Sequence, residues 1–255
     1  MSLMSSPVPP IPPMVPASTA SVAAFVVIVI GVAAMIVCGT ASASRRLGET
    51  PARTRQRALR WTVGLALWLA ITALLSGSGV LEVPGVPPRA MLMMAGCNLL
   101  ALGLALSPVG ARLARGLPIA ALVGFHGFRL PLELVLHRWY VEGVLPVQMT
   151  YQGRNLDIIT GVAALALGLL LWRREPDQSR ARALVWTFNL VGLGLLINVM
   201  SIAVLSSPFP FRVFMNEPAV QLIFYAPYGW IVPMCVAPAL AGHVLLFRWL
   251  RRGSA

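Results

Sequence analysis

The sequence has no lysine: all 20 of its basic residues are arginine, against eight acidic residues. Cysteine and histidine are also scarce, with three of each. The cysteines all fall inside apolar runs without a metal-type spacing, which excludes a disulfide framework and a cysteine-based metal site. No nucleophile–base motif or phosphate-binding loop is present. The sequence therefore predicts no metal site and no cofactor, and it assigns no catalytic residue.

Charged residues make up only 11% of the 255 residues, whereas hydrophobic residues make up 58%. In a soluble protein the net charge of +12 would suggest a nucleic-acid partner. Here the arginines lie at the ends of long apolar runs, so we expect no nucleic-acid partner. The expected partners are the lipid bilayer and the anionic lipid headgroups on one of its faces.

The apolar runs approach the ~20 residues that cross a bilayer. They predict an all-α integral membrane protein, a bundle of seven transmembrane helices in a single domain over residues 19–252. Residues 1–18, rich in proline and serine, are predicted to be a disordered tail, and residues 253–255 a short second tail. The predicted spans are residues 21–40, 61–80, 90–106, 117–136, 156–172, 183–205 and 223–247.

Arginine is distributed unevenly between the two sides of these spans. Fifteen arginines follow the first, third, fifth and seventh spans, and four lie on the opposite side. The positive-inside rule therefore predicts an N-terminus outside and a cytoplasmic C-terminus. Arginine without lysine is typical of a GC-rich bacterial genome, so we expect a multi-pass protein of the bacterial inner membrane. The oligomeric state cannot be predicted from this pattern.

Spans one to three run in the same directions as spans five to seven, an arrangement that resembles SWEET-type sugar transporters and rhodopsins. A retinal Schiff base needs a lysine, which this chain lacks. The SWEET arrangement would predict a proline in the first helix of each repeat, and neither 21–40 nor 156–172 contains one. The residues therefore support membership of neither family.

The fourth span contains four ionisable residues at spacings of three, four and four: His126, Arg129, Glu133 and His137. In a helix these steps return to one face. Charged groups inside a membrane are costly and usually face a protein interior or water. This stripe is the strongest candidate for a ligand site or an ion path.

Arg129 and Glu133 are one turn apart, so we expect them to form a buried ion pair. Pro131 removes the hydrogen bond to the carbonyl of Gly127 and is predicted to kink the helix. Such a pair can equally lock helices together without any chemistry, and this alternative stays open. Catalysis by Glu133 or His137 as acid or base is a further alternative.

The connector before the fifth span is unusually polar. Its Arg154, Asn155 and Asp157 either cap the next helix or fold over the stripe as a lid. Near the last span, Tyr225 is a further candidate, although aromatic residues there are typical of an interfacial belt. The asparagines inside spans three and six are expected to form hydrogen bonds between helices.

The leading hypothesis is a membrane protein with an outward-facing polar cavity on the fourth helix, which binds or transports a small solute, a proton or a lipid. The sequence does not decide whether the protein is an enzyme, although it favours a protein that is not one. The alternatives are a membrane-embedded enzyme that uses Glu133 and His137, and a structural or assembly subunit.

Overall fold

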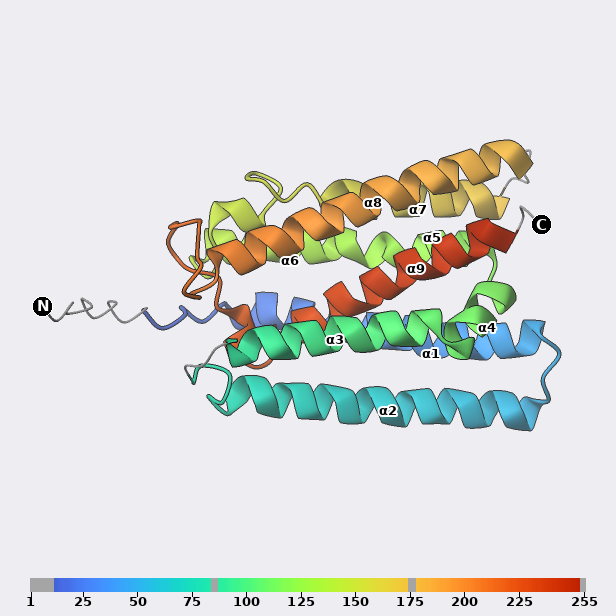
Figure 1. The fold of residues 1–255 in the computed structure, drawn as a ribbon, viewed down its shortest axis with the longest axis horizontal. Helices are drawn as coiled ribbons and strands as arrows, with labels where there is room; N and C mark the ends of the chain where they lie inside the picture. The colour runs from blue at the N-terminus through green and yellow to red at the C-terminus, as the bar shows by residue number, and fades with distance from the viewer. Residues whose placement is uncertain (1–11, 84–86, 174–177, 253–255) are drawn as a thin grey trace, which may run out of the picture.

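The computed structural model describes residues 12–83, 87–173 and 178–252, and all regular secondary structure in these residues is helical (Figure 1). Residues 1–11 of the predicted tail, and the predicted tail 253–255, lie outside the described residues. The α-helices are α1 (Thr19–Arg46), α2 (Pro51–Gly77), α3 (Arg89–Leu106), α4 (Pro108–Gly116), α5 (Ile119–Gly124), α6 (Arg129–Val141), α7 (Ile158–Arg173), α8 (Gln178–Ser206) and α9 (Ala237–Arg252).

Six helical segments are long and apolar enough to cross a membrane. They are Thr19–Arg46, Pro51–Gly77, Arg89–Leu106, Ile119–Val141, Ser179–Ser206 and Tyr228–Arg252. The fifth predicted span, 156–172, is shorter than expected, because α7 has 16 residues and is about 24 Å long. It begins only at Ile158 because the polar residues before it turn inward, as described below.

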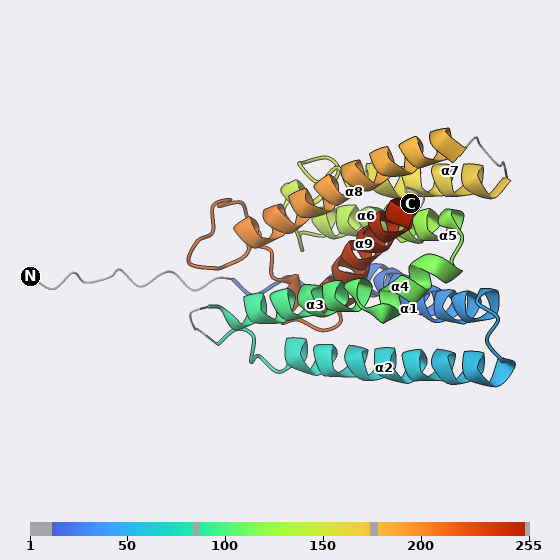
Figure 2. The ribbon, with the colours of Figure 1, turned by 45° about the vertical axis from the view of Figure 1, so that its right-hand side comes forward.

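The helices form a bundle with α9 running obliquely through its middle, in contact with α3, α4, α5 and α8 (Figures 1 and 2). The connection from α1 to α2, helix α4 and the end of α9 lie at one end of the bundle, and residues 12–18 lie at the other. We call the first of these the arginine-rich end. Helix α2 lies at the edge, where it packs on α1 and on residues 222–230.

Two arginine-rich segments that lie between the predicted spans are helical. Helix α2 begins ten residues before the predicted span, because Thr50 caps it and Pro51 occupies its first position. Helix α4 occupies the predicted loop after the third span, again with a serine cap, Ser107, and a proline, Pro108. The sequence prediction equated helices with apolar runs, whereas these caps start helices in arginine-rich segments.

The fourth and last spans are both interrupted. A 3₁₀ turn, Phe125–Phe128, separates α5 from α6 just before Pro131, where the sequence predicted a kink. The last span begins with a 3₁₀ turn, Tyr228–Trp230, and a π-helical turn, Ile231–Val236, before α9. Such irregular backbone inside a membrane is tolerated where it is buried in protein or lines a cavity.

Helix α7 packs very closely on the fourth span through two glycines. A Cβ atom on Gly161 would lie within 3 Å of the backbone of Leu130, and one on Gly168 would lie 3.1 Å from Gly124 Cα. Small residues let membrane helices approach at this distance. This contact brings the start of α7 directly against α6.

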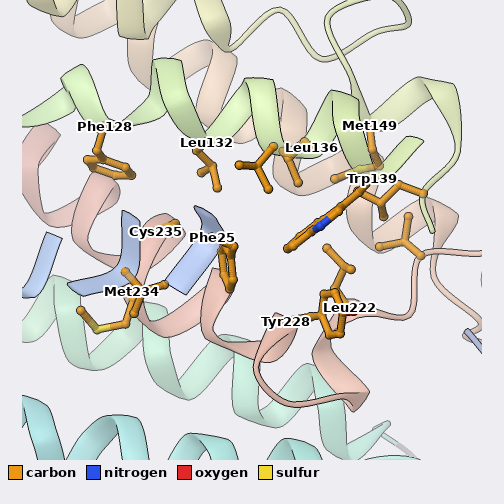
Figure 3. Packing of buried hydrophobic residues seen from close by; sticks show 14 of the residues in the cluster. Phe25, Phe128, Leu132, Leu136, Trp139, Met149, Leu222, Tyr228, Met234 and Cys235 are labelled. Carbon is orange, nitrogen blue, oxygen red and sulfur yellow. The ribbon is translucent and has the colours of Figure 1, made fainter. Parts of the chain in front are cut away.

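At the end opposite the arginine-rich end, aromatic rings from segments far apart in the sequence pack against one another (Figure 3). The ring of Trp139 in α6 lies 5.1 Å from that of Phe25 in α1 and 5.0 Å from that of Tyr228. Trp139 Nε1 also donates a hydrogen bond to Ser21 Oγ at 3.2 Å. These contacts therefore hold α1, α6 and the segment before α9 together.

Glu142, just after α6, ties the start of α1 to the same place. Its carboxylate accepts hydrogen bonds from the Ser18 backbone N–H, from Ser18 Oγ and Ser21 Oγ, and from Arg138 Nε. Partial burial raises the pKa of Glu142, but the hydrogen bonds from Ser18, Ser21 and Arg138 outweigh it and hold the pKa at about 2. The group is therefore ionised near neutral pH, which keeps this contact in place.

Candidate functional site

Arg129, the first residue of α6, is 1% exposed and forms a two-pronged ion pair with Asp157. Its Nε donates to Asp157 Oδ2 at 2.5 Å, and its Nη2 donates to Oδ1. The predicted pair with Glu133 is therefore wrong: the partner comes from the start of α7. A carboxylate on a separate segment can meet both prongs of the planar guanidinium, a geometry that favours Arg–carboxylate pairs.

The third nitrogen of the guanidinium, Nη1, donates to the carbonyl of Gly192 in α8 at 3.3 Å and to His243 Nε2 in α9 at 3.1 Å. Because a guanidinium is only a donor, Nε2 of His243 accepts and the ring proton resides on Nδ1. That Nδ1 donates to Asn189 Oδ1 at 2.8 Å, and Asn189 Nδ2 donates back to the carbonyl of His243 at 3.2 Å. His243 is thus neutral, and its only acceptor nitrogen is occupied.

Glu133 is also 1% exposed, and its partner is an amide rather than a cation. Nδ2 of Asn155 lies 2.9 and 2.8 Å from its two carboxyl oxygens. Asn155 is held in turn, because its Nδ2 also donates to the Met149 carbonyl and its Oδ1 accepts from the Asp157 backbone N–H. No cation lies within hydrogen-bonding distance of Glu133 in the described ranges.

The buried charges of this network do not balance when Glu133 is ionised. Arg129 and Asp157 cancel, and His243 is neutral by its hydrogen bonds. One negative charge then remains on Glu133 in a segment that lies among apolar side chains. A buried unpaired charge is costly, and such groups usually neutralise.

His126 lies on the other side of Arg129 and is fully buried. Neither ring nitrogen has a hydrogen-bond partner in the part of the chain that the structure describes. Its ring lies 4.2 Å from that of His243. Gly242 permits this contact, since a Cβ there would lie 2.7 Å from His126 Nε2.

A cavity of about 90 Å³ adjoins the network. Arg129, Glu133 and Asp157 line it on one side, and the rest of its wall is almost entirely apolar, from α3, α6, α8 and the π-helical turn. Since a water molecule occupies about 30 Å³ of liquid, this volume corresponds to roughly three waters. A drug-sized ligand would need ~300–1,000 Å³.

Three predicted site residues lie outside this network. His137 is half-buried, with its ring 4.6 Å from that of Tyr151. Arg154 is exposed, and its guanidinium lies over the ring of Phe214 at 5.5 Å. Tyr225 is half-buried and packs against the apolar core. Of the predicted lid, therefore, only Asn155 and Asp157 reach the stripe.

Two members of the network, His243 and Asn189, were not among the predicted site residues. For Asn189 we predicted only an interhelical hydrogen bond, and it makes one with His243 of α9. His243 meets His126 because α9 crosses the bundle obliquely. No periodicity within a single span carries that information, although a lone histidine in an apolar run is an indication that it has a polar partner.

Gly192 provides a test of how tightly this network is packed. A Cβ at position 192 would lie 2.8 Å from His243 Cε1, whereas one at Gly194, on the same helix, would meet nothing within 4 Å. Gly192→Ala is expected to destabilise the protein by about 1–3 kcal/mol, as overpacking does. Gly194→Ala should be neutral or slightly stabilising, because alanine is the better helix former. Equal melting temperatures of the two variants in detergent would contradict this packing.

Residues 86–251 match a family described as a domain of unknown function, DUF8737. The match covers about two thirds of the chain, and the chain therefore belongs to this family. The whole polar network lies inside the matched region, whereas α1 and α2 precede it. No curated protein and no solved structure matches the chain significantly.

Proposed function

We propose that this member of the DUF8737 family is a proton carrier of the bacterial inner membrane, in which Glu133 takes up and releases the proton. The observation that carries the proposal is the buried carboxyl group of Glu133, which borders a small cavity and, among the described residues, is hydrogen-bonded by an amide and not by a cation. Arg129 and Asp157 form the fixed, neutral pair beside it. The arginine-rich, lysine-free composition supports the bacterial origin.

In the proposed topology α7 crosses the membrane as a seventh span, with the N-terminus outside and the arginine-rich end in the cytoplasm. The arginine bias supports this orientation, and the start of α1 and the end of α9 at opposite ends of the bundle are compatible with it. A periplasmic reporter inserted near Gln152 or Asn216 should then be active. Activity of the same reporter fused after Ala255 would contradict the topology.

A bound proton accounts for the burial of the Glu133 carboxyl group better than a permanent counter-ion does. A buried charge without a partner costs several kcal/mol, so a carboxyl group in this position is stable mainly in its neutral form. The Asn155 amide lies within hydrogen-bonding distance of both carboxyl oxygens and can donate to the carbonyl oxygen that remains when the group is protonated. Ionisation therefore becomes possible when water or a base reaches the cavity, and this defines a site that loads and releases one proton.

The size of the cavity favours a proton over a larger solute. About 90 Å³ accommodates a few waters and is well below the ~300–1,000 Å³ that a drug-sized ligand needs. His137 lies one helical turn beyond Glu133, toward the end opposite the arginine-rich end, and Nδ1 of its ring has no partner within the described residues. Because an imidazole ring can both accept and donate a proton, His137 is the proposed entry point from outside.

Proteoliposomes that contain a pH-sensitive dye test the proposal. Under a potassium diffusion potential, the wild-type protein should move protons, and His137→Gln should slow this flux by about a hundredfold, the lower end of what a proton-transfer group contributes. Because His137 is only half-buried, its replacement should change the unfolding free energy by less than about 1 kcal/mol. Wild-type flux equal to that of empty liposomes would contradict the proposed function.

A further inference from the structure

A second, much larger hollow extends toward the arginine-rich end of the bundle. It is a crevice of about 790 Å³, with α1 and α2 on one side and α3, α4, α5 and α9 on the other. Helix α2 packs on α1 and, at the far end of the bundle, on residues 222–230. The π-helical turn separates the two hollows: Cys235 lines the small cavity, and Pro233 and Met234 line the crevice.

The crevice has the length of one lipid leaflet. Its lining runs from Met35 to Arg46 along α1 and from Pro233 to Leu245 along the last span. At ~1.5 Å per residue these stretches are about 16 and 18 Å long. Half of the ~30 Å hydrocarbon core of a bilayer is about 15 Å. A solute in water has no reason to match this dimension, whereas an acyl chain does.

The crevice wall is mostly apolar, and its two charged residues are Arg46, the last residue of α1, and Arg60, in the first half of α2. Neither arginine has a hydrogen-bond or ion-pair partner within the described ranges. The nearby Glu49 is already bound by Arg57 and Arg112. Two unpaired guanidinium groups in the lining of an apolar crevice are complementary to an anionic headgroup that is attached to an acyl chain.

We propose that this crevice is a binding site for one anionic phospholipid of the leaflet at the arginine-rich end. The phosphate lies between Arg46 and Arg60, and an acyl chain lies along α1, α2 and α9. Trp61 and Trp68 of α2 line the same crevice and provide rigid apolar walls. This site is independent of the proton site, because it lies on the other side of the π-helical turn and shares no lining residue with the small cavity.

Glycine at position 64 leaves room for the chain. Gly64 lines the crevice, and a Cβ there would meet no protein atom within 4 Å. Gly96 of α3 has equally open surroundings but does not line the crevice. Phenylalanine at position 64 should therefore obstruct the lipid, whereas phenylalanine at position 96 should not. Comparison of the two variants therefore distinguishes an obstructed crevice from a general effect of a larger side chain.

Native mass spectrometry of the full chain tests the proposal, using protein exchanged into nanodiscs of phosphatidylglycerol and phosphatidylcholine. The wild type is expected to retain one phosphatidylglycerol molecule after release from the nanodisc. Arg46→Gln combined with Arg60→Gln should bind it about tenfold more weakly, because two charge-assisted hydrogen bonds are lost. Arg53→Gln with Arg55→Gln, which removes two exposed arginines of α2 outside the crevice, should retain it.

The glycine variants complete the experiment. Gly64→Phe should lose the lipid and Gly96→Phe should keep it, with both proteins folded by circular dichroism. A wild type that retains no lipid, or that retains phosphatidylcholine equally well, would overturn the proposal. Retention of phosphatidylglycerol by the Arg46/Arg60 variant or by Gly64→Phe at the wild-type level would also overturn it.

Discussion

Replacement of Asp157 by asparagine is expected to lower the free energy of unfolding by about 3–5 kcal/mol, the cost of removing one partner of a buried ion pair. The change leaves the Arg129 guanidinium buried and unpaired. It also disturbs Thr160, whose Oγ1 donates to Asp157 Oδ1 at 3.2 Å. Chemical unfolding in detergent, followed by circular dichroism, measures the effect.

A double variant, Arg129→Met with Asp157→Leu, separates the ion pair from simple packing. Because it removes both charges together, it should recover much of the stability that Asp157→Asn loses. A double variant that is no more stable than Asp157→Asn would show that the two residues are not energetically coupled. Glu133→Gln should not share this loss, because Glu133 is not the partner of Arg129.

Replacement of Glu133 by glutamine is expected to abolish proton movement in the proteoliposome assay while the protein stays folded. Glutamine keeps the size of the side chain and a carbonyl oxygen that can accept from Asn155. It cannot exchange a proton, and it is neutral like the protonated carboxyl group that it replaces. The unfolding free energy should therefore change by less than about 1 kcal/mol.

The matched control is Glu82→Gln, which removes an exposed carboxylate from the segment between α2 and α3. Its flux and its stability should both equal those of the wild type. Full proton flux in Glu133→Gln would contradict the assignment of the proton site. A loss of flux that is accompanied by unfolding would contradict the claim that Glu133 acts in function rather than in structure.

The membrane helices could be predicted from sequence because hydrophobic length is a local property. Six of the predicted spans correspond to long apolar helices. The ends of the helices were less predictable: Thr50 and Ser107, each followed by a proline, start helices in segments that charge alone marks as loops. The fifth predicted span is short because Asn155 and Asp157 turn inward before it.

The candidate site was only partly predictable. The spacing of the stripe identified Arg129 and Glu133, because a helix repeats within one segment. The partners depend on contacts between segments: Asp157 approaches because α7 packs closely through Gly161, and His243 because α9 crosses the bundle. The i, i+4 spacing therefore predicted an ion pair between Arg129 and Glu133. In the structure Arg129 instead pairs with Asp157, a better-oriented carboxylate just before α7.

Infrared difference spectroscopy of the protein in lipid tests the central claim, that Glu133 exchanges a proton inside the membrane, most directly. The carbonyl-stretch band of a protonated carboxylic acid should disappear when neutral buffer, in which exposed carboxylates are already ionised, is replaced by alkaline buffer. We predict that this band is present in the wild type and in Glu82→Gln and absent in Glu133→Gln. A band that persists unchanged in Glu133→Gln, or that the wild type lacks at every pH, would contradict the account.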